Sequence, residues 1–479
     1  MGAVEAPPSS TLTARWAVFV VLWAVLGGVI PALLITQVPN VGRSSGWLLT
    51  LALIVWSGAR LAHRIATGRP ELFDFVFWLF TYVFMALAPT VQMRADQPST
   101  TTPGMLPEQD VRTAAVVWLG VLCYEVGRFW AGRGRRHAEP EHAPAAPVLD
   151  VVPARAVVLT VIGVLAAAYY VSRIGVGTLF MSRYTAYSIR SERMPDVATR
   201  SIVSAAGSYP LLIAIGVYVR LWVTRALGSR SAQYLPFAAI ATFVLLVVTN
   251  PISSARYDFG TVAFALVVFA GVMGTPARAR LAMAGTVLAL LFVFPVADAF
   301  RSENVDVRRA GFFGEYLGNA DYDGFWQIGN ALSFFDDGLV RPFRQAAGVL
   351  LFWVPRGVWP DKPADTGIVL AEYRGYGFTN LSAPLWAELV VNGGIALLVV
   401  GFVALGFALR RLDRRATAAL LGGGLWWAII GAVFPFYMVI LLRGSLLQAT
   451  GTFVVALAAT LFVRAGRSAQ PRAPATTSE

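Results

Sequence analysis

Charge and cysteine are scarce in this chain of 479 residues, and their scarcity excludes several classes of protein. Only 14% of the residues are charged while 57% are hydrophobic, and the mean hydropathy is +0.62, which does not fit a soluble globular protein. Cys123 is the one cysteine, so an intramolecular disulfide and a cluster of thiolate metal ligands are excluded. Lys362 is the one lysine and Pro363 follows it, so the chain has no Gly-Lys-Ser/Thr phosphate loop and an ATP-driven pump is not expected.

Long apolar runs are what the sequence does contain. Runs of roughly 17 to 25 residues, long enough to cross the apolar core of a bilayer, recur along most of the chain. The sequence therefore predicts an all-α polytopic membrane protein. The first run, 16–38, is too long for a signal peptide and lacks a small-residue cleavage site, so we expect it to stay in the membrane. About twelve spans are predicted, at 16–37, 46–63, 72–91, 111–131, 154–173, 201–222, 234–250, 258–274, 281–300, 384–409, 417–441 and 444–464.

The arginines predict which way these spans run. The formal net charge is +12, but the arginines lie at the ends of apolar runs rather than in soluble basic patches, so nucleic acid is not an expected partner. By the positive-inside rule, the arginine-rich turns and both termini are cytoplasmic, in a multi-pass protein of the cytoplasmic (inner) membrane. The turns after the even-numbered spans carry Arg60, Arg64 and Arg69; Arg128, Arg133, Arg135 and Arg136; Arg225 and Arg230; Arg278 and Arg280; Arg410, Arg411, Arg414 and Arg415; and Arg464 and Arg467.

The polar segments divide the chain. A segment of over 80 residues, 301–383, exceeds a normal connection and is predicted to be one large extracytoplasmic loop with a function. Within it, 338–353 has the apolar density of a helix that rests on or dips into the membrane. Residues 175–200 are expected to form an amphipathic helix at the outer interface. The predicted parts are disordered tails at 1–12 and 466–479, spans one to four at 13–131, a cytoplasmic linker at 132–152, spans five to nine at 153–300, the loop at 301–383, and spans ten to twelve at 384–465.

Arginines on the predicted outer side violate the charge bias, and each needs a reason. Guanidinium groups bind phosphate through two hydrogen bonds and stay charged, which suits an anionic headgroup at the outer leaflet. Charge deep in apolar sequence, as at Arg443 within VILLRGSLLQ, marks a candidate functional site. The alternative is that each arginine reaches lipid phosphates or pairs with a nearby carboxylate. The six arginines are Arg183, Arg190, Arg256, Arg301, Arg356 and Arg443.

Two acidic features on the same side are candidates for chemistry. Glu388 stands where an apolar run has already begun, and a carboxylate partly buried at the top of a helix is suited to act as a general base. The alternative is a glutamate at a helix end that pairs with an outer arginine. Asp321-Tyr322-Asp323 matches the Asp-x-Asp pattern of metal-dependent sugar-nucleotide transferases. Nucleotide sugars are not expected outside the cell, however, and further oxygen ligands are missing, so no metal site is predicted.

The second half of the chain carries a family resemblance. Between Trp353 and Gly394 the sequence contains PRGVWPDKP, GYGFTNLSAPLWAE and VNGG, and it contains NPISSARYDFG at 250–260, FPVADAFRSEN at 294–304 and ILLRGSL at 440–446. These segments resemble bacterial oligosaccharide repeat-unit polymerases, the Wzy-type O-antigen polymerases. The resemblance covers 250–446, and the N-terminal half matches only as generic spans. The related O-antigen ligases look similar in having a His-Asn pair with a glutamate nine residues beyond the histidine. Here Asn380 and Glu388 keep that spacing, but Thr379 replaces the histidine, which disfavours a ligase.

The resemblance implies a metal-independent, inverting glycosyl transfer without a cofactor at the outer face of the membrane. A glycan on polyprenyl pyrophosphate would be the donor and the next lipid-linked repeat unit the acceptor, with membrane lipid around the site and a chain-length regulator or flippase as a possible partner protein. A ligase-like transferase and a flippase or transporter stay open as alternatives. The implied catalytic residues are Glu388, Arg256, Arg301 and Arg443, and the implied substrate-binding residues are Arg183, Arg190, Tyr257, Arg356, Trp359, Lys362 and Asn380.

Overall fold

The computed structural model describes residues 9–133, 149–296 and 311–466 of the chain, and it is all-helical. Within these residues the only β-type pairing is one isolated bridge between Val151 and Arg464. In the first half, the helices are α1 (Ser9–Trp23), η1 (Ala24–Val29), α2 (Ile30–Gln37), α3 (Gly46–Thr67), α4 (Leu72–Phe80), η2 (Thr81–Leu87), α5 (Ala88–Arg94), α6 (Glu108–Arg133), α7 (Pro153–Ile174), η3 (Val176–Phe180), α8 (Arg183–Arg193), α9 (Val197–Ala206), α10 (Tyr209–Thr224), η4 (Gly228–Tyr234) and α11 (Leu235–Val248). In the second half they are α12 (Arg256–Phe269), η5 (Val272–Gly274), α13 (Pro276–Leu288), η6 (Ala289–Val293), α14 (Phe294–Val296), α15 (Gly311–Gly318), η8 (Ala320–Tyr322), α16 (Gly324–Asp336), α17 (Arg344–Leu350), α18 (Thr366–Arg374), α19 (Leu385–Gly422), α20 (Trp426–Arg443) and α21 (Leu446–Phe462).

The polytopic membrane fold is confirmed. In the described chain, ten helical runs are long and apolar enough to cross a bilayer, and they match ten of the twelve predicted spans. The two others are shorter: the region predicted as a span at 258–274 forms α12 and η5, and the last span is the 17-residue helix α21. The total of twelve crossings therefore stays a prediction.

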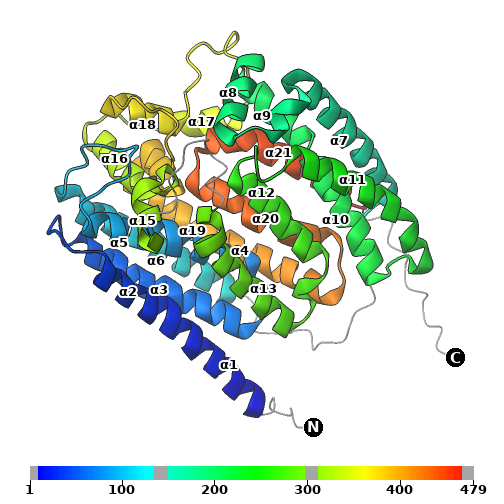
Figure 1. The fold of residues 1–479 in the computed structure, drawn as a ribbon, viewed down its shortest axis with the longest axis horizontal. Coiled ribbons are helices and arrows are strands. Elements are labelled where there is room, and N and C mark those ends of the chain that lie inside the picture. Colours follow the sequence, from blue (N-terminus) through cyan, green and yellow to red (C-terminus); the bar gives the residue numbers. More distant parts are fainter. Residues whose placement is uncertain (1–8, 134–148, 297–310, 467–479) are drawn as a thin grey trace.

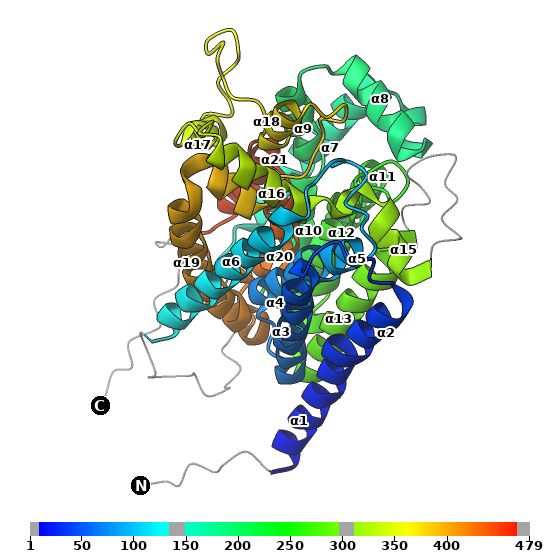
Figure 2. The ribbon, with the colours of Figure 1, turned by 90° about the vertical axis from the view of Figure 1, so that its left-hand side faces the viewer.

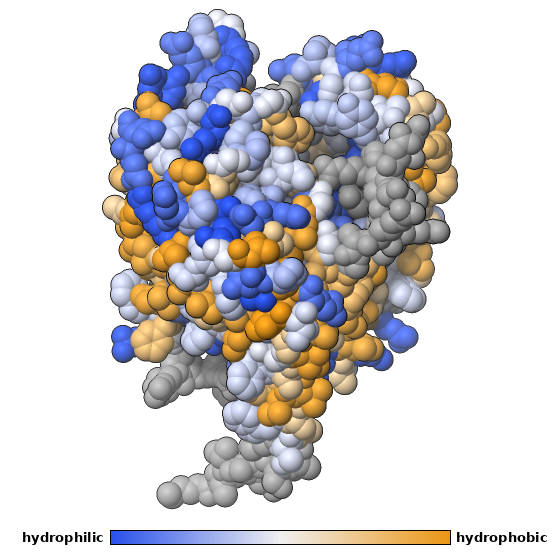
Figure 3. Space-filling view, turned by 60° about the vertical axis from the view of Figure 1, so that its left-hand side comes forward, coloured by the Kyte–Doolittle hydropathy of each residue, from blue (hydrophilic) through white to orange (hydrophobic). Residues whose placement is uncertain are grey.

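The long helices form one bundle, and several short helices of the connecting segments gather at one of its ends (Figures 1 and 2). Figures 1 and 2 show α8, α17 and α18 together at the top of the bundle, which we call the loop end. The first residues of α1 lie toward the other end, which we call the opposite end. The surface in Figure 3 follows this division, with hydrophilic residues concentrated near the loop end and hydrophobic residues on the sides of the bundle below. Such a lateral apolar surface is what contact with lipid requires.

Part of the predicted loop 301–383 is packed into the bundle rather than spread over it. Residues 324–333 of α16 are all buried. Gln92 of α5 fixes this segment, because its amide donates to the Tyr316 carbonyl at 2.8 Å and accepts from the Trp326 indole at 2.7 Å. The apolar stretch predicted as a helix at 338–353 is helical only over α17. The expected amphipathic helix within 175–200 is present as α8.

Three predicted boundaries differ from the structure. The helix α19 continues to Gly422, so the arginines at 410–415 lie on its last turns and not in a turn between spans. The helix α1 already begins at Ser9, inside the predicted tail 1–12. Most of the linker 132–152 and of the tail 466–479 lies outside the described residues, as does the start of the large loop.

Candidate functional site

Two arginines from different helices meet on one carboxylate at the loop end. Arg256 is the first residue of α12 and Arg443 is the last residue of α20, whereas Asp321 comes from the short helix η8 in the large loop. Arg256 forms an ion pair with one carboxylate oxygen of Asp321, and Arg443 donates to the other at 3.1 Å. The Arg443 Nε atom also donates to the backbone carbonyl of Asp321 at 2.9 Å. We call Arg256 and Arg443 the arginine pair.

Local structure fixes each member of this group. The Asn319 side chain accepts from the Asp321 amide at 3.0 Å and so caps η8. Arg256 donates to the Phe294 carbonyl at 2.9 Å and its guanidinium lies 4.2 Å from the centre of the Phe294 ring. The guanidinium of Arg443 lies 5.2 Å from the centre of the Tyr257 ring. These ring contacts favour a charged guanidinium at a partly desolvated place.

A second carboxylate, Asp323, lies next to the arginine pair. It is 1% exposed, accepts from the Ser382 amide at 3.0 Å and lies 3.7 Å from Arg443. Burial raises the pKa of Asp323 above its ordinary value, although Arg443 and the hydrogen bond from Ser382 oppose this. Asp321 and Asp323 are the predicted Asp-x-Asp pattern. In the structure they face arginines, and no group of three or more His, Cys, Asp or Glu residues suited to a metal occurs in the described part of the chain.

Two further predicted arginines lie close to the start of α12. Arg183 of α8 lies close enough for its charge, like those of Arg256 and Arg443, to act on the Tyr257 hydroxyl. Arg190 of the same helix donates to the Ser253 hydroxyl at 3.2 Å, in the turn that leads into α12. Asn250 holds this turn in place, since its side chain accepts from the Ile252 and Ser253 amides, both at 3.0 Å. The fold thus brings together Arg183, Arg190, Arg256, Tyr257 and Arg443 from three separate segments.

Glu388 lies nearby and is fully enclosed. It is in the first turn of α19 and is 1% exposed. One carboxylate oxygen accepts from the Thr366 hydroxyl at 2.8 Å, and the other accepts from the Leu446 amide at 2.8 Å. The Ala383 amide donates to the Arg443 carbonyl at 3.0 Å. The segment that carries Glu388 therefore holds the turn between α20 and α21, and with it the backbone of Arg443.

The other predicted binding residues lie elsewhere or serve the loop itself. Lys362 donates to the carbonyls of Phe352 and Val354 at 2.6 and 2.9 Å, and Arg356 donates to the Lys362 carbonyl at 2.8 Å. Both cations therefore close the proline-rich turn in which they stand, next to the half-buried Trp359. Asn380 is exposed on the segment before α19. Arg301 lies outside the described residues.

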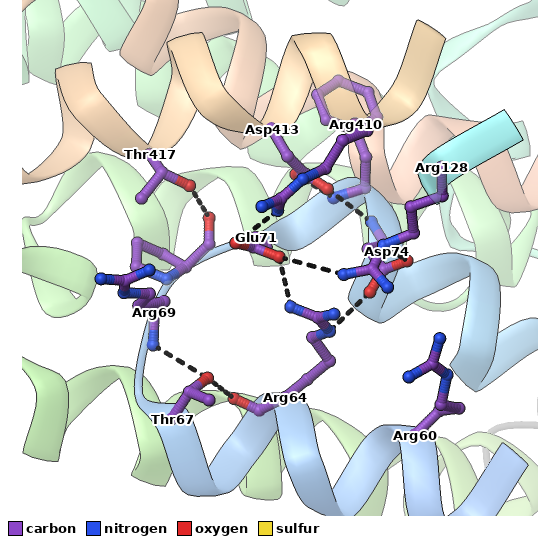
Figure 4. A network of polar contacts seen from close by, with 12 residues as sticks. Arg60, Arg64, Thr67, Arg69, Glu71, Asp74, Arg128, Arg410, Asp413 and Thr417 are labelled. Carbon is purple, nitrogen blue, oxygen red and sulfur yellow. Dashed lines mark hydrogen bonds and ion pairs between the residues drawn. The ribbon is translucent and has the colours of Figure 1, made fainter. Parts of the chain in front are cut away.

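A second group of charges lies at the opposite end (Figure 4). Arg64 of α3 contacts both Glu71 and Asp74, Arg128 of α6 lies 3.0 Å from Asp74, and Arg410 of α19 lies 2.6 Å from Glu71. Asp413 accepts from the amides of Phe73 and Asp74, both at 2.9 Å, and so caps α4. We call Arg64, Glu71, Asp74, Arg128, Arg410 and Asp413 the charged cluster. The sequence assigned its arginines to topology alone, and it gave no sign that they pair with acidic residues.

The residues that sequence reasoning missed at the loop end are the hydrogen-bond and ion-pair partners of the predicted ones. Asp321 is the partner of the arginine pair, Ser382 supports Asp323, and Thr366 supports Glu388. The Asp-x-Asp pattern was the available signal for the first of these. No family model, curated protein or solved structure matches the chain.

Proposed function

We propose that the chain is a membrane glycosyltransferase that polymerises polyprenyl-pyrophosphate-linked oligosaccharide repeat units at the outer face of the cytoplasmic membrane. The observation that carries this proposal is the arginine pair, held at the ends of two helices and paired with the buried Asp321. Pyrophosphate is the leaving group of such a transfer, and negative charge develops on it as the glycosidic bond breaks. Fixed guanidinium groups at that place stabilise the transition state more than the ground state.

The surroundings of the arginine pair fit a lipid-linked anion. Both arginines stand at ends of helices, and Arg183 and Arg190 add positive charge from α8. Exposed aromatic side chains of α8, Tyr184 and Tyr187, lie on the same helix. A pyrophosphate on a polyprenyl chain needs charge at the membrane surface and apolar surface below it, and this is how the loop end and the sides of the bundle are divided in Figure 3.

Asp321 and Asp323 hold the arginine pair in place before substrate binds. In the structure both guanidinium groups already pair with Asp321, and Arg443 also lies 3.7 Å from Asp323. A pyrophosphate with two or more negative charges competes with a single carboxylate for the same donors. The carboxylates therefore hold the guanidinium groups in place and away from water. The pyrophosphate then replaces a carboxylate as the acceptor of some of their hydrogen bonds.

Glu388 positions Arg443 in this proposal. Both of its oxygens are bonded, and one of them holds the Leu446 amide three residues beyond Arg443. Its predicted action as the general base would require the acceptor hydroxyl to reach a carboxylate that is only 1% exposed.

The test is glycan synthesis by purified protein. Lipid-linked repeat units are extracted from cells that lack the gene and are incubated with full-length protein in detergent, and products are separated by gel electrophoresis. The wild type is expected to produce a ladder. Arg256→Ala and Arg443→Ala are expected to lower the rate about 100- to 1,000-fold, the usual loss when one stabilising donor is removed.

The matched control is Arg341→Ala, which removes an exposed arginine of the same loop. It should leave the ladder unchanged. Ladders of normal length from both Arg256→Ala and Arg443→Ala would remove the arginine pair from the reaction. In cells that lack the gene, single units on the outer side agree with a polymerase, whereas lipid-linked units trapped inside would identify a flippase instead.

A further inference from the structure

A small polar cavity lies at the start of α12, the helix whose first residue is Arg256. Its volume is about 70 Å³. This is room for several water molecules, and so for the hydroxyl-bearing edge of one sugar ring. Polar side chains from separate parts of the chain line it, among them Arg190, Ser208, Tyr209, Thr249, Asp258 and Thr452.

Two polar groups of this cavity are buried without a partner. The hydroxyl of Tyr209, a residue that is 4% exposed, forms no hydrogen bond within the described chain. The Nε atom of Arg190 is also buried and makes none there, although another nitrogen of the same guanidinium binds Ser253. Folded proteins pair nearly all buried polar groups. Donors left open toward a polar cavity indicate a ligand with oxygen acceptors.

Asp258 is the acid of this cavity. It stands on the first turn of α12, two residues after Arg256, and the charges of Arg183 and Arg190 act on it. Its carboxylate takes part in no hydrogen bond or ion pair among the described residues, whereas both oxygens of Glu388 are bonded. Of the two acids, Asp258 is the one that lines this cavity, whereas Glu388 is only 1% exposed.

We infer that this cavity receives the hydroxyl-bearing edge of the acceptor sugar and that Asp258 is the general base of the transfer. The inference rests on the proposed function. The acceptor oxygen forms a bond to the anomeric carbon of the donor, and its proton passes to the Asp258 carboxylate. The bond from the anomeric carbon to the pyrophosphate breaks, and its electron pair leaves on the phosphate oxygen, next to Arg256 and Arg443. Arg190 and Tyr209 hold the acceptor.

The test separates binding of the lipid pyrophosphate from transfer. Full-length protein is titrated with farnesyl pyrophosphate, a short polyprenyl pyrophosphate, and the same preparation is assayed for polymer with extracted lipid-linked units. Asp258→Asn is expected to bind farnesyl pyrophosphate like the wild type and to lower the rate of transfer about 100-fold or more, as loss of a general base does. Asp361→Asn removes an exposed acid of the large loop and is expected to change neither quantity.

A milder variant guards against misfolding. Tyr209→Phe removes a single oxygen atom and keeps every charge of the cavity. Loss of one hydrogen bond to the acceptor should slow transfer at low acceptor concentration about fivefold, with farnesyl pyrophosphate binding unchanged. Normal transfer in Tyr209→Phe would overturn the assignment of the cavity to the acceptor.

The remaining outcomes are distinct. If the wild type forms polymer and Asp258→Asn does so at the same rate, the inference fails while the proposed function stands. If Glu388→Gln binds farnesyl pyrophosphate but does not transfer, and Asp258→Asn does transfer, Glu388 is the base. If the wild type forms no polymer, the proposed function fails and the inference fails with it.

Discussion

Asp321 is the residue that joins the two arginines at the loop end into one site. It lies between Arg256 and Arg443 and accepts from both. A buried ion pair contributes little net stability compared with apolar residues, but removal of one partner leaves an unpaired buried charge. Such an arrangement is maintained more readily for recognition than for stability.

We expect Asp321→Ala to lower the free energy of unfolding by about 3 kcal/mol, because the buried guanidinium of Arg256 and the partly buried one of Arg443 would lose their shared acceptor. Thermal unfolding of the purified protein measures this. The matched control is Asp336→Ala, since Asp336 also pairs with an arginine, Arg112, but at the surface, with side chains 44% and 48% exposed. That change should cost at most about 1 kcal/mol. Equal losses in the two variants would contradict the buried role of Asp321.

At the scale of single residues, the sequence predicted the cations better than their partners. Arg256 and Arg443 stood out because arginine on the predicted outer side violates the charge bias. Asp321 did not, because it meets them across 65 and 122 residues of sequence, and an Asp-x-Asp pattern alone fits a metal as well as a guanidinium. Lys362 is the opposite case. As the one lysine it was predicted to bind substrate, but in the structure it donates to two backbone carbonyls of its own turn.

Among the helices, α19 is the element that joins the loop to the bundle, and it is broken to do so. Gly394 has φ 65° and ψ −160°, a conformation that favours glycine, and an added Cβ atom would lie 2.5 Å from the Phe335 ring. Asn392, just before the break, accepts from the Ala346 amide of α17 at 2.8 Å. The break therefore turns the first two turns of α19, which carry Glu388, toward the large loop.

Gly394→Ala is expected to destabilise the protein by about 1–3 kcal/mol through backbone strain, with the clash against Phe335 in addition, and to lower polymer formation because Glu388 would move relative to Leu446. Unfolding temperature and the ladder assay report the two effects. Gly422→Ala, near the end of the same helix, meets no atom within 4 Å and should be neutral or slightly stabilising. A Gly394→Ala protein with wild-type stability would show that the break is not required.

The elements were predicted well where hydropathy alone determines them and poorly where packing does. Ten of the predicted spans coincide with apolar helices. The burial of α16 was not predicted, because its sequence GFWQIGNALSFFD carries polar residues that find partners far along the chain, such as Ser333 bonded to Gln109 and Trp326 bonded to Gln92. A segment of this kind resembles a loop until its long-range partners are known.

Over the whole molecule, the two ends of the bundle are built differently. At the opposite end, the charged cluster fixes α3, α4, α6 and α19 to one another with charges that are mutually paired. At the loop end, by contrast, Asp258, Tyr209 and Arg190 face a cavity. The paired charges of the opposite end hold its helices together, whereas the polar groups that face the cavity at the loop end are available to bind a ligand. The proposed function requires in addition that the loop end faces the outside of the cell.

The single buried cysteine makes that orientation measurable. Val358 is 76% exposed at the loop end, and Arg278 is exposed at the start of α13, whereas Cys123 is buried. In intact cells, a membrane-impermeant maleimide is expected to label Val358→Cys and to leave Arg278→Cys unlabelled until the membrane is opened, because arginine-rich segments stay in the cytoplasm. The unchanged protein should not react in either state. Labelling of Arg278→Cys in intact cells, with Val358→Cys protected, would place the arginine pair on the cytoplasmic side, where outward-facing lipid-linked glycan cannot reach it.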